Sequence, residues 1–336
     1  MLSRSKPPRV WLCAVVLLVC PGCRAAPRSA PPGDSTWAAA LQRTLDSVRR
    51  DLDAPGAVLG VARGDQFPTV VATGLANLES ATPMLPDQAY FLGSISKVYT
   101  AAAVLRLVEN GVLALDDSLA RFLPSFPDAN RITIRMLLQH TSGLKDFYAY
   151  LYYRPDRAEM IRLVTKRWTE DELLGLAARF GRWFEPGTDW SYSSTNYYLL
   201  GVIVERLTGS SLAEAYRRLL FEPLEIRHTW LTLHEEPRGT LPTGYLGPVE
   251  SWSHSAMFGE LGPTSVLDTS SVEWGAGGLA TPAVDALRFL SGLFRDRIVS
   301  SAILEVMTDF RETPSLGVTD SASTEESDGY GLGVVR

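Results

Sequence analysis

Cysteine is scarce in this 336-residue chain, and its distribution excludes several kinds of chemistry. The three cysteines, Cys13, Cys20 and Cys23, all lie within the first 23 residues. The body of the chain therefore has no disulfide, no thiolate zinc site and no cysteine nucleophile. The N-terminus also lacks an apolar stretch long enough to span a membrane. The apolar run at 10–19 is shorter than the roughly 20 residues that a membrane-spanning helix needs.

Positive charge is the second shortage, and lysine above all. The chain has 32 Lys and Arg residues against 38 Asp and Glu, for a net charge of −6, and only four of the basic residues are lysines. Because the chain is acidic and has no basic cluster, we do not expect it to bind nucleic acid. Hydrophobic residues at 46% and charged residues at 21% are typical of a globular protein, and the length allows one large domain or two.

The N-terminus has the layout of a secretory signal. In residues 1–22, basic residues precede the apolar run, and small residues follow it. The residues before Cys23 resemble a bacterial lipoprotein signal, whose cleavage leaves a lipid-modified cysteine, and cleavage after Ala25 is the alternative that gives a free secreted protein. Residues 23–35 are rich in Pro, Ala and Ser and indicate a flexible tether before a folded domain at 36–336. We expect an extracytoplasmic or periplasmic protein of the bacterial cell envelope, attached to the membrane only through its N-terminal lipid.

Apolar periodicity predicts strands near the two ends of the chain and helices between them. The pattern predicts a helix at 36–52, an antiparallel hairpin at 56–64 and 68–76, and a strand at 329–336. Further helices are predicted at 94–110, 133–139, 195–208, 211–221 and 282–294, the last capped by Thr281 with Pro282 as its first residue. This order predicts an α+β fold, with an antiparallel sheet built from both chain ends, flanked by helices, and an inserted mainly helical region.

A Ser-x-x-Lys pattern occurs three times, as Ser3/Lys6, Ser94/Lys97 and Ser142/Lys145. On a helix this spacing brings an amine to a hydroxyl, and a desolvated lysine can act as a base. Only Ser94 follows a glycine and opens a strongly apolar helix, whose N-terminus favours a developing oxyanion. Lys97 is also one of few lysines in a chain rich in arginine, which could not act as a base. Ser94 and Lys97 are therefore the candidate nucleophile and base, and a chance surface lysine is the alternative.

Several ordered segments resemble the serine beta-lactamase-like family, which includes class C beta-lactamases, D-alanyl-D-alanine carboxypeptidases and related esterases. These segments are FLGSISK at 91–97, GVLALDD at 111–117, IRMLLQHTSGL at 134–144 and YSSTNY at 192–197. The likeness covers the chain from about residue 40 to its end. It implies a beta-lactamase/transpeptidase-like fold and a serine hydrolase that acts through an acyl-enzyme on small esters, amides or D-alanyl peptides, with no cofactor and no metal. Carried over by position, it makes Ser94 the acylated nucleophile, Lys97 the proton acceptor and Tyr192 the acid/base that protonates the leaving group.

The chain departs from the family pattern at two places. The usual Tyr-x-Asn reads Tyr192-Ser193-Ser194, so Ser194 becomes the substrate-binding residue, although a hydroxyl cannot bridge two groups as an amide does. The family's late Lys-Thr-Gly or His-x-Gly strand has no match, which implies a chain truncated before its last strands and closing helix, with weak or absent activity. A non-catalytic penicillin- or peptidoglycan-binding sensor, or an inactive family member, is the alternative function.

Two other features carry structural interpretations. His140 stands at a predicted helix end, where an imidazole can cap carbonyls, and no Asp or Glu stands around it at metal-ligand spacing. The aromatic residues in 147–153 belong either to a pocket for apolar acyl groups or to the core. The identity of the substrate and the oligomeric state are not indicated by the sequence.

Overall fold

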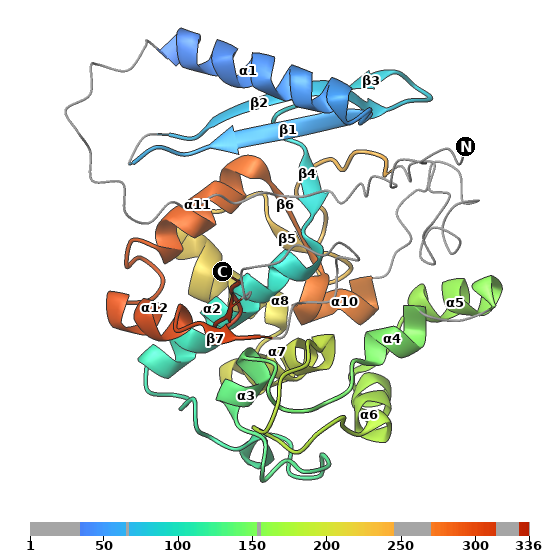
Figure 1. Ribbon diagram of the computed structural model, residues 1–336, viewed down its shortest axis with the longest axis vertical. Coiled ribbons are helices and arrows are strands. Elements are labelled where there is room, and N and C mark those ends of the chain that lie inside the picture. The colour runs from blue at the N-terminus through green and yellow to red at the C-terminus, as the bar shows by residue number, and fades with distance from the viewer. Residues whose placement is uncertain (1–33, 65–66, 153–155, 245–269, 314–328, 336) are drawn as a thin grey trace, which may run out of the picture. The chain divides into compact units, whose positions relative to one another are not determined.

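The structure is a computed structural model of the chain, and it describes residues 34–64, 67–152, 156–244, 270–313 and 329–335 (Figure 1). The chain divides into two compact units. Among the described residues, the first unit contains 34–61, 69–86 and 241–244, and the second contains the rest. The predicted signal segment, Cys23 and the tether up to residue 33 lie outside the described residues.

The first unit is one helix packed on an antiparallel sheet (Figure 1). Helix α1 begins at Asp34, inside the predicted tether, and packs Leu41 and Leu45 against Val71 of the sheet. The predicted helix and hairpin are confirmed, and a short third strand joins the hairpin at its second strand. The elements are α1 (Asp34–Asp51), β1 (Gly56–Val61), β2 (Thr69–Asn77) and β3 (Thr82–Pro83).

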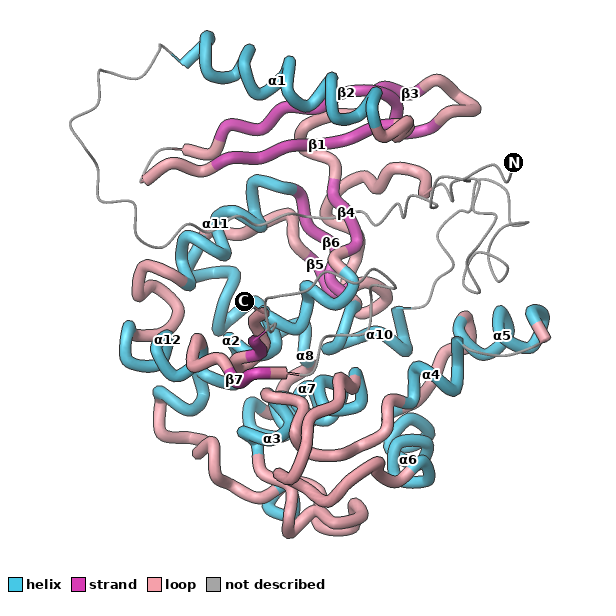
Figure 2. Tube along the Cα trace, viewed as in Figure 1, coloured by secondary structure: helices cyan, strands magenta, loops and turns pink. Residues whose placement is uncertain are grey.

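The second unit is mainly helical and contains a three-stranded antiparallel sheet in the order β4-β6-β5 (Figure 2). Its strands are β4 (Ala89–Phe91), β5 (Trp230–Leu231), β6 (Leu279–Pro282), β7 (Arg311–Glu312) and β8 (Gly329–Tyr330). Its α-helices in the described ranges are α2 (Ser96–Glu109), α3 (Ile134–Leu138), α4 (Phe147–Tyr152), α5 (Arg157–Val164), α6 (Glu170–Phe180), α7 (Ser194–Thr208), α8 (Leu212–Tyr216), α10 (Ser270–Gly277), α11 (Ala283–Leu293) and α12 (Ser301–Met307). Shorter helical turns are η1 (Gly93–Ile95), η2 (Leu119–Arg121), η3 (Arg217–Phe221) and η4 (Glu222–Leu224). No helix among these described elements is long and apolar enough to cross a membrane.

Two buried helices, α2 and α7, form the centre of the second unit. The five residues Ala101–Leu105 of α2 are fully buried, and α7 is buried from Ser194 through Val204. A helix that is apolar on every side needs neighbours on every side, and α2 and α7 pack on each other and on α10. The rigid frame that results carries the N-terminal turns of both helices, where the candidate site lies.

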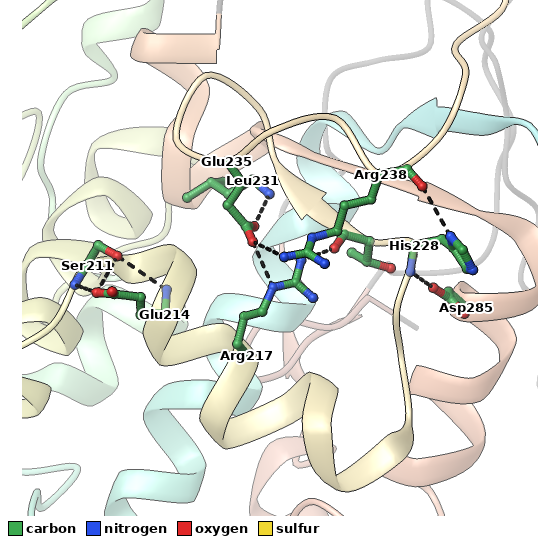
Figure 3. Close-up of polar contacts among 9 residues, drawn as sticks. Ser211, Glu214, Arg217, His228, Leu231, Glu235, Arg238 and Asp285 are labelled. Atoms are coloured by element: carbon green, nitrogen blue, oxygen red, sulfur yellow. Dashed lines mark hydrogen bonds and ion pairs between the residues drawn. The ribbon is translucent and has the colours of Figure 1, made fainter.

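A set of polar contacts connects η3, β5 and α11 (Figure 3). The Arg217 guanidinium pairs with Glu235 at 2.7 Å, and the other oxygen of Glu235 accepts the backbone N–H of Leu231 at 2.8 Å. Asp285 in the first turn of α11 accepts the backbone N–H of His228 at 2.7 Å. The His228 side chain itself is exposed.

The α+β fold class is confirmed, but two details differ from the sequence prediction. Pro282 is the N-cap of α11, and Thr281 lies in β6, where its buried hydroxyl bonds that of Thr229 at 2.6 Å instead of capping the helix. The predicted strand at 329–336 is only two residues long, because the chain turns at Gly333, whose φ is +83°. In the described residues β8 pairs with β7, so the last strand and the N-terminal hairpin belong to different sheets rather than to a single sheet from both chain ends.

Candidate active site

Ser94 lies in the turn that connects β4 to α2. Gly93 precedes it with a φ of +52°, a conformation that glycine adopts without the steric cost of a side chain. The short helix η1 then leads directly into α2. Ser94 is exposed, although the helix that follows it is among the most buried elements of the chain. A hydroxyl at this place is open to a substrate and stands on a rigid support.

Lys97 lies one turn after Ser94 and is only 2% exposed. Its Nζ donates to Ser94 Oγ at 3.3 Å and to the backbone carbonyl of Ala276 at 2.8 Å. The carbonyl comes from α10, far along the chain, so the ammonium is oriented by the tertiary fold as well as by its own helix. The predicted pairing of the hydroxyl with the amine is thus present in the structure. A base placed this close to a hydroxyl can take its proton during attack on a carbonyl.

The Ser142/Lys145 pattern has a different geometry. Ser142 is 1% exposed, and its hydroxyl donates to Asn196 Oδ1 at 2.6 Å. The Lys145 ammonium lies 4.4 Å from the centre of the Trp183 ring. Because the Ser142 hydroxyl is buried and already bonded, it lacks the access that a nucleophile needs. The Ser3/Lys6 pattern lies outside the described residues.

Tyr192 meets Lys97 from the loop before α7. The Lys97 Nζ lies 5.0 Å from the centre of the Tyr192 ring, so residues 95 positions apart in the sequence meet at one point. Tyr192 is half-buried, between Ser191 and Ser193. Of the predicted residues, Ser94, Lys97 and Tyr192 therefore form one cluster.

Ser194 begins α7 and is held by Asp146. Its backbone N–H donates to Asp146 Oδ2 at 3.0 Å. A carboxylate at a helix N-terminus stabilises the exposed N–H groups and the helix dipole. Burial raises the pKa of Asp146, while the hydrogen bonds and the charge of Lys97 lower it. Ser194 is 5% exposed and stands two residues after Tyr192 in the chain.

His140 is fully buried behind Tyr192. Its imidazole does not cap carbonyls as the sequence indicates, because its nitrogens bond two N–H donors and one phenol. Nδ1 accepts the Ser193 N–H at 3.1 Å and faces Asn196 Nδ2 at 3.0 Å, and Nε2 lies 3.0 Å from Tyr330 Oη. Burial first, and then the charge of Lys97, lower the pKa of His140 well below its usual range, so the ring is neutral.

Sequence reasoning missed Asp146, Asn196 and Tyr330. Asn196 was detectable, because an amide within the apolar helix 195–204 needs buried hydrogen-bond partners. Asp146 and Tyr330 had no local signal, because both act on groups that are distant in the sequence. The carbonyl of Ala276 was equally hidden, since any residue type supplies one. The aromatic stretch after Asp146 is core at Phe147, whose side chain is fully buried.

Comparison with known proteins gives a consistent result. The chain matches the Beta-lactamase family over residues 41–336. It is 32% identical over 320 residues to esterase EstB of Burkholderia gladioli, an alignment that covers 89% of this chain and 79% of the esterase. It is 36% identical over 201 residues to penicillin-binding protein 4 of Amycolatopsis lactamdurans, covering 58% of this chain and 49% of that protein. The chain thus spans about half the length of that penicillin-binding relative.

Solved structures show the same likeness in three dimensions. The D-amino acid amidase of Ochrobactrum anthropi SV3, in complex with L-phenylalanine amide, superposes with a TM-score of 0.69 at 27% sequence identity. The superposition covers 88% of this chain and 79% of the amidase.

Proposed function

Since the chain belongs to the beta-lactamase family of serine hydrolases, we propose that it hydrolyses small esters, amides or D-amino acid peptides through an acyl-enzyme on Ser94. The observation that carries the proposal is the contact between the buried Lys97 ammonium and the exposed Ser94 hydroxyl, at 3.3 Å. The names of the relatives, an esterase and a D-amino acid amidase, support this range of substrates.

The reaction follows from the positions of three side chains. Ser94 Oγ attacks the substrate carbonyl and passes its proton to Lys97, which must be neutral at that moment. The tetrahedral intermediate collapses as Tyr192 protonates the departing alcohol or amine, and an ester of Ser94 remains. Water then attacks this ester, and the acid product leaves with Ser94 restored. Lys97 Nζ bonds Ser94 Oγ and lies 5.0 Å from the centre of the Tyr192 ring, so the three groups that this reaction needs stand in one cluster.

The residue at position 194 affects which substrates the site can bind. We propose that it binds the substrate near the scissile bond, in the place of the family's asparagine. A hydroxyl has one donor, whereas an amide has two donors and a carbonyl acceptor, so Ser194 has less hydrogen-bonding capacity for a substrate than that asparagine. We therefore expect esters and simple amides to be turned over better than β-lactams.

A non-catalytic penicillin- or peptidoglycan-binding sensor is the second candidate function. Relatives named penicillin-binding protein favour it. It requires the same acylation of Ser94 but no deacylation, so the two functions separate at the second step. We propose that the protein acts in the cell envelope, which its penicillin-binding relatives support, and that a lipid on Cys23 anchors it there. Mass spectrometry of the membrane-associated protein tests the anchor, and an unmodified N-terminus after Ala25 refutes it.

The test of the proposed function is covalent labelling followed by a chase. A fluorophosphonate or a penicillin should add one label per chain, and peptide mapping should place it on Ser94. Label that persists in Ser94→Ala, on Ser142 or Ser194, would overturn the assignment. Loss of the acyl group of a nitrophenyl ester with time, accompanied by its acid product, identifies a hydrolase. An acyl-enzyme that forms with this ester and persists identifies the sensor, and the fluorophosphonate label is permanent in either case.

A further inference from the structure

His140 contacts the chain on both sides of Tyr192. Its backbone carbonyl accepts the N–H of Ser191 at 3.0 Å, and its Nδ1 accepts the N–H of Ser193 at 3.1 Å. The imidazole ring packs on the Tyr192 ring, with the two centres 4.4 Å apart. One residue therefore holds the backbone before and after the tyrosine and also supports its side chain.

The backbone of His140 is itself unusual. Its φ is +60°, which is uncommon for a residue other than glycine and is tolerated best by Asn, Asp and His. This conformation presents the carbonyl and the imidazole of one residue to the same loop. Backbone strain of this kind persists only where the surrounding structure holds it, and it often marks a functional site. His140 is fully buried and contacts the proposed catalytic residue Tyr192.

The hydrogen-bond network assigns the proton on the imidazole. Nδ1 accepts the Ser193 N–H, so the proton is on Nε2 and is donated to Tyr330 Oη at 3.0 Å. The nearby Tyr197 also packs its ring on the imidazole, with the centres 5.3 Å apart, and its hydroxyl donates to the Leu138 carbonyl at 2.9 Å.

A second branch fixes the imidazole from the side of α7. Ser142 donates to Asn196 Oδ1 at 2.6 Å, so the amide nitrogen of Asn196 faces His140 Nδ1 at 3.0 Å. The ring is thus held by α7, by Ser142 and by the C-terminal strand β8. A buried network with several partners for one ring restricts the orientations that the ring can adopt.

We infer that His140 is a positioning residue for Tyr192, which it holds through Ser191 and Ser193 at the place where Tyr192 protonates the leaving group. Tyr330 and Asn196 keep the imidazole in the orientation that this requires. The inference rests on the proposed function, and specifically on Tyr192 as the acid.

The test uses two leaving groups and two substitutions. His140→Asn keeps an acceptor near the place of Nδ1 and suits a positive φ, whereas His140→Leu removes the acceptor. The rate of Ser94 acylation is measured by intact mass with a nitrophenyl ester, whose leaving group departs without a proton, and with the ethyl ester of the same acid, which needs one. The exposed His228→Asn serves as the matched control.

We expect His140→Leu to slow acylation by the ethyl ester about 100-fold, the scale of a misplaced catalytic group. Acylation by the nitrophenyl ester should slow several times less, and His140→Asn should recover most of the ethyl ester rate. Tyr192→Phe should show the same leaving-group dependence. In a Tyr192→Phe background, His140→Leu should add little, because it acts through a hydroxyl that is already absent.

The possible results distinguish a failure of the positioning role of His140 from a failure of the proposed function. Equal losses with both esters, or full additivity with Tyr192→Phe, would overturn the positioning role and leave the proposed function intact. A Tyr192→Phe protein with the original rates would show that Tyr192 is not the acid, and a wild-type protein that neither ester acylates would refute the proposed function itself. If His140→Leu does not fold, His140→Gly, which suits the positive φ and also lacks the acceptor, replaces it in the same double-substitution cycle.

Discussion

Replacement of Gly201 by alanine should reveal how the packing of α7 controls the position of Lys97. Gly201 is buried in α7, against the indole of Trp274. A Cβ at position 201 would lie 2.7 Å from Trp274 Cζ3, with two more ring carbons at 3.1 and 3.2 Å. A rigid ring that is 6% exposed cannot turn away into solvent, so the ring or its backbone must shift.

The shift of Trp274 has consequences for the catalytic cluster. Trp274 has a φ of +28° and stands two residues before Ala276, whose carbonyl accepts the Lys97 Nζ at 2.8 Å. Its own carbonyl accepts the N–H of Gly278 at 2.7 Å, so the segment 274–278 is one tight turn. Displacement of the indole therefore moves the acceptor that orients Lys97.

Gly175 in α6 provides a matched control for the change in free energy of unfolding. Both glycines are helical, so alanine gains about 1 kcal/mol of helix propensity at either position. A Cβ at Gly175 meets no atom within 4 Å, so Gly175→Ala should stabilise the protein by about that amount. Gly201→Ala adds an overpacking cost of about 1–3 kcal/mol. The two variants should therefore differ by the overpacking cost alone.

Urea unfolding of both variants measures this difference, and nitrophenyl ester hydrolysis measures its effect on the site. We expect Gly201→Ala to lose about 10- to 100-fold in acylation rate, because small displacements of catalytic groups are costly. Gly175→Ala should keep the original rate. Equal stabilisation of the two variants, with unchanged rates, would refute the packing argument and the coupling of Trp274 to Lys97.

Two further predictions concern the titratable side chains of Lys97 and His140. Lys97→Arg should leave the protein folded but lower turnover at least about 100-fold, because arginine keeps the charge and cannot release a proton. Lys145→Arg, a change on an ion–ring contact that arginine also makes, is its control, and equal hydrolysis by both variants would exclude Lys97 as the base. Because the pKa of His140 is lowered in the folded chain, the unfolded chain binds a proton near pH 6.5 and the folded chain does not. The contribution of the His140 imidazole to the free energy of unfolding is therefore present above pH 6.5 and is lost as the pH falls below 6.5. Urea unfolding between pH 7.5 and 5 should show this loss in the wild type and a smaller one in His140→Asn, and identical pH profiles would contradict the assignment.

The local pattern of the sequence was sufficient for the elements that depend on near neighbours. The helix at the start of the first unit, the hairpin after it and α2 were all predicted from apolar spacing, because burial of one face or of a whole helix shows directly in the order of residue types. The pairing of Ser94 with Lys97 belongs to this class, since a separation of three residues on one helix determines their distance. The family likeness was equally readable, because several short segments recur in a fixed order.

Tertiary packing decided everything that joins distant parts of the chain. It brought Tyr192 to Lys97 and placed the Ala276 carbonyl as the acceptor of the ammonium. It also gave the His140 imidazole the Ser193 N–H and the Tyr330 hydroxyl as partners instead of the carbonyls at its helix end. Backbone N–H and C=O groups are the same in every residue apart from proline, so no residue type marks which of them will be used. The short last strand shows the same limit, because its turn at Gly333 fits against Ala101 in α2 and not against anything nearby in sequence. The candidate reactive groups were therefore a prediction from the sequence, whereas their alignment came from the packing of buried helices that only the folded chain brings together.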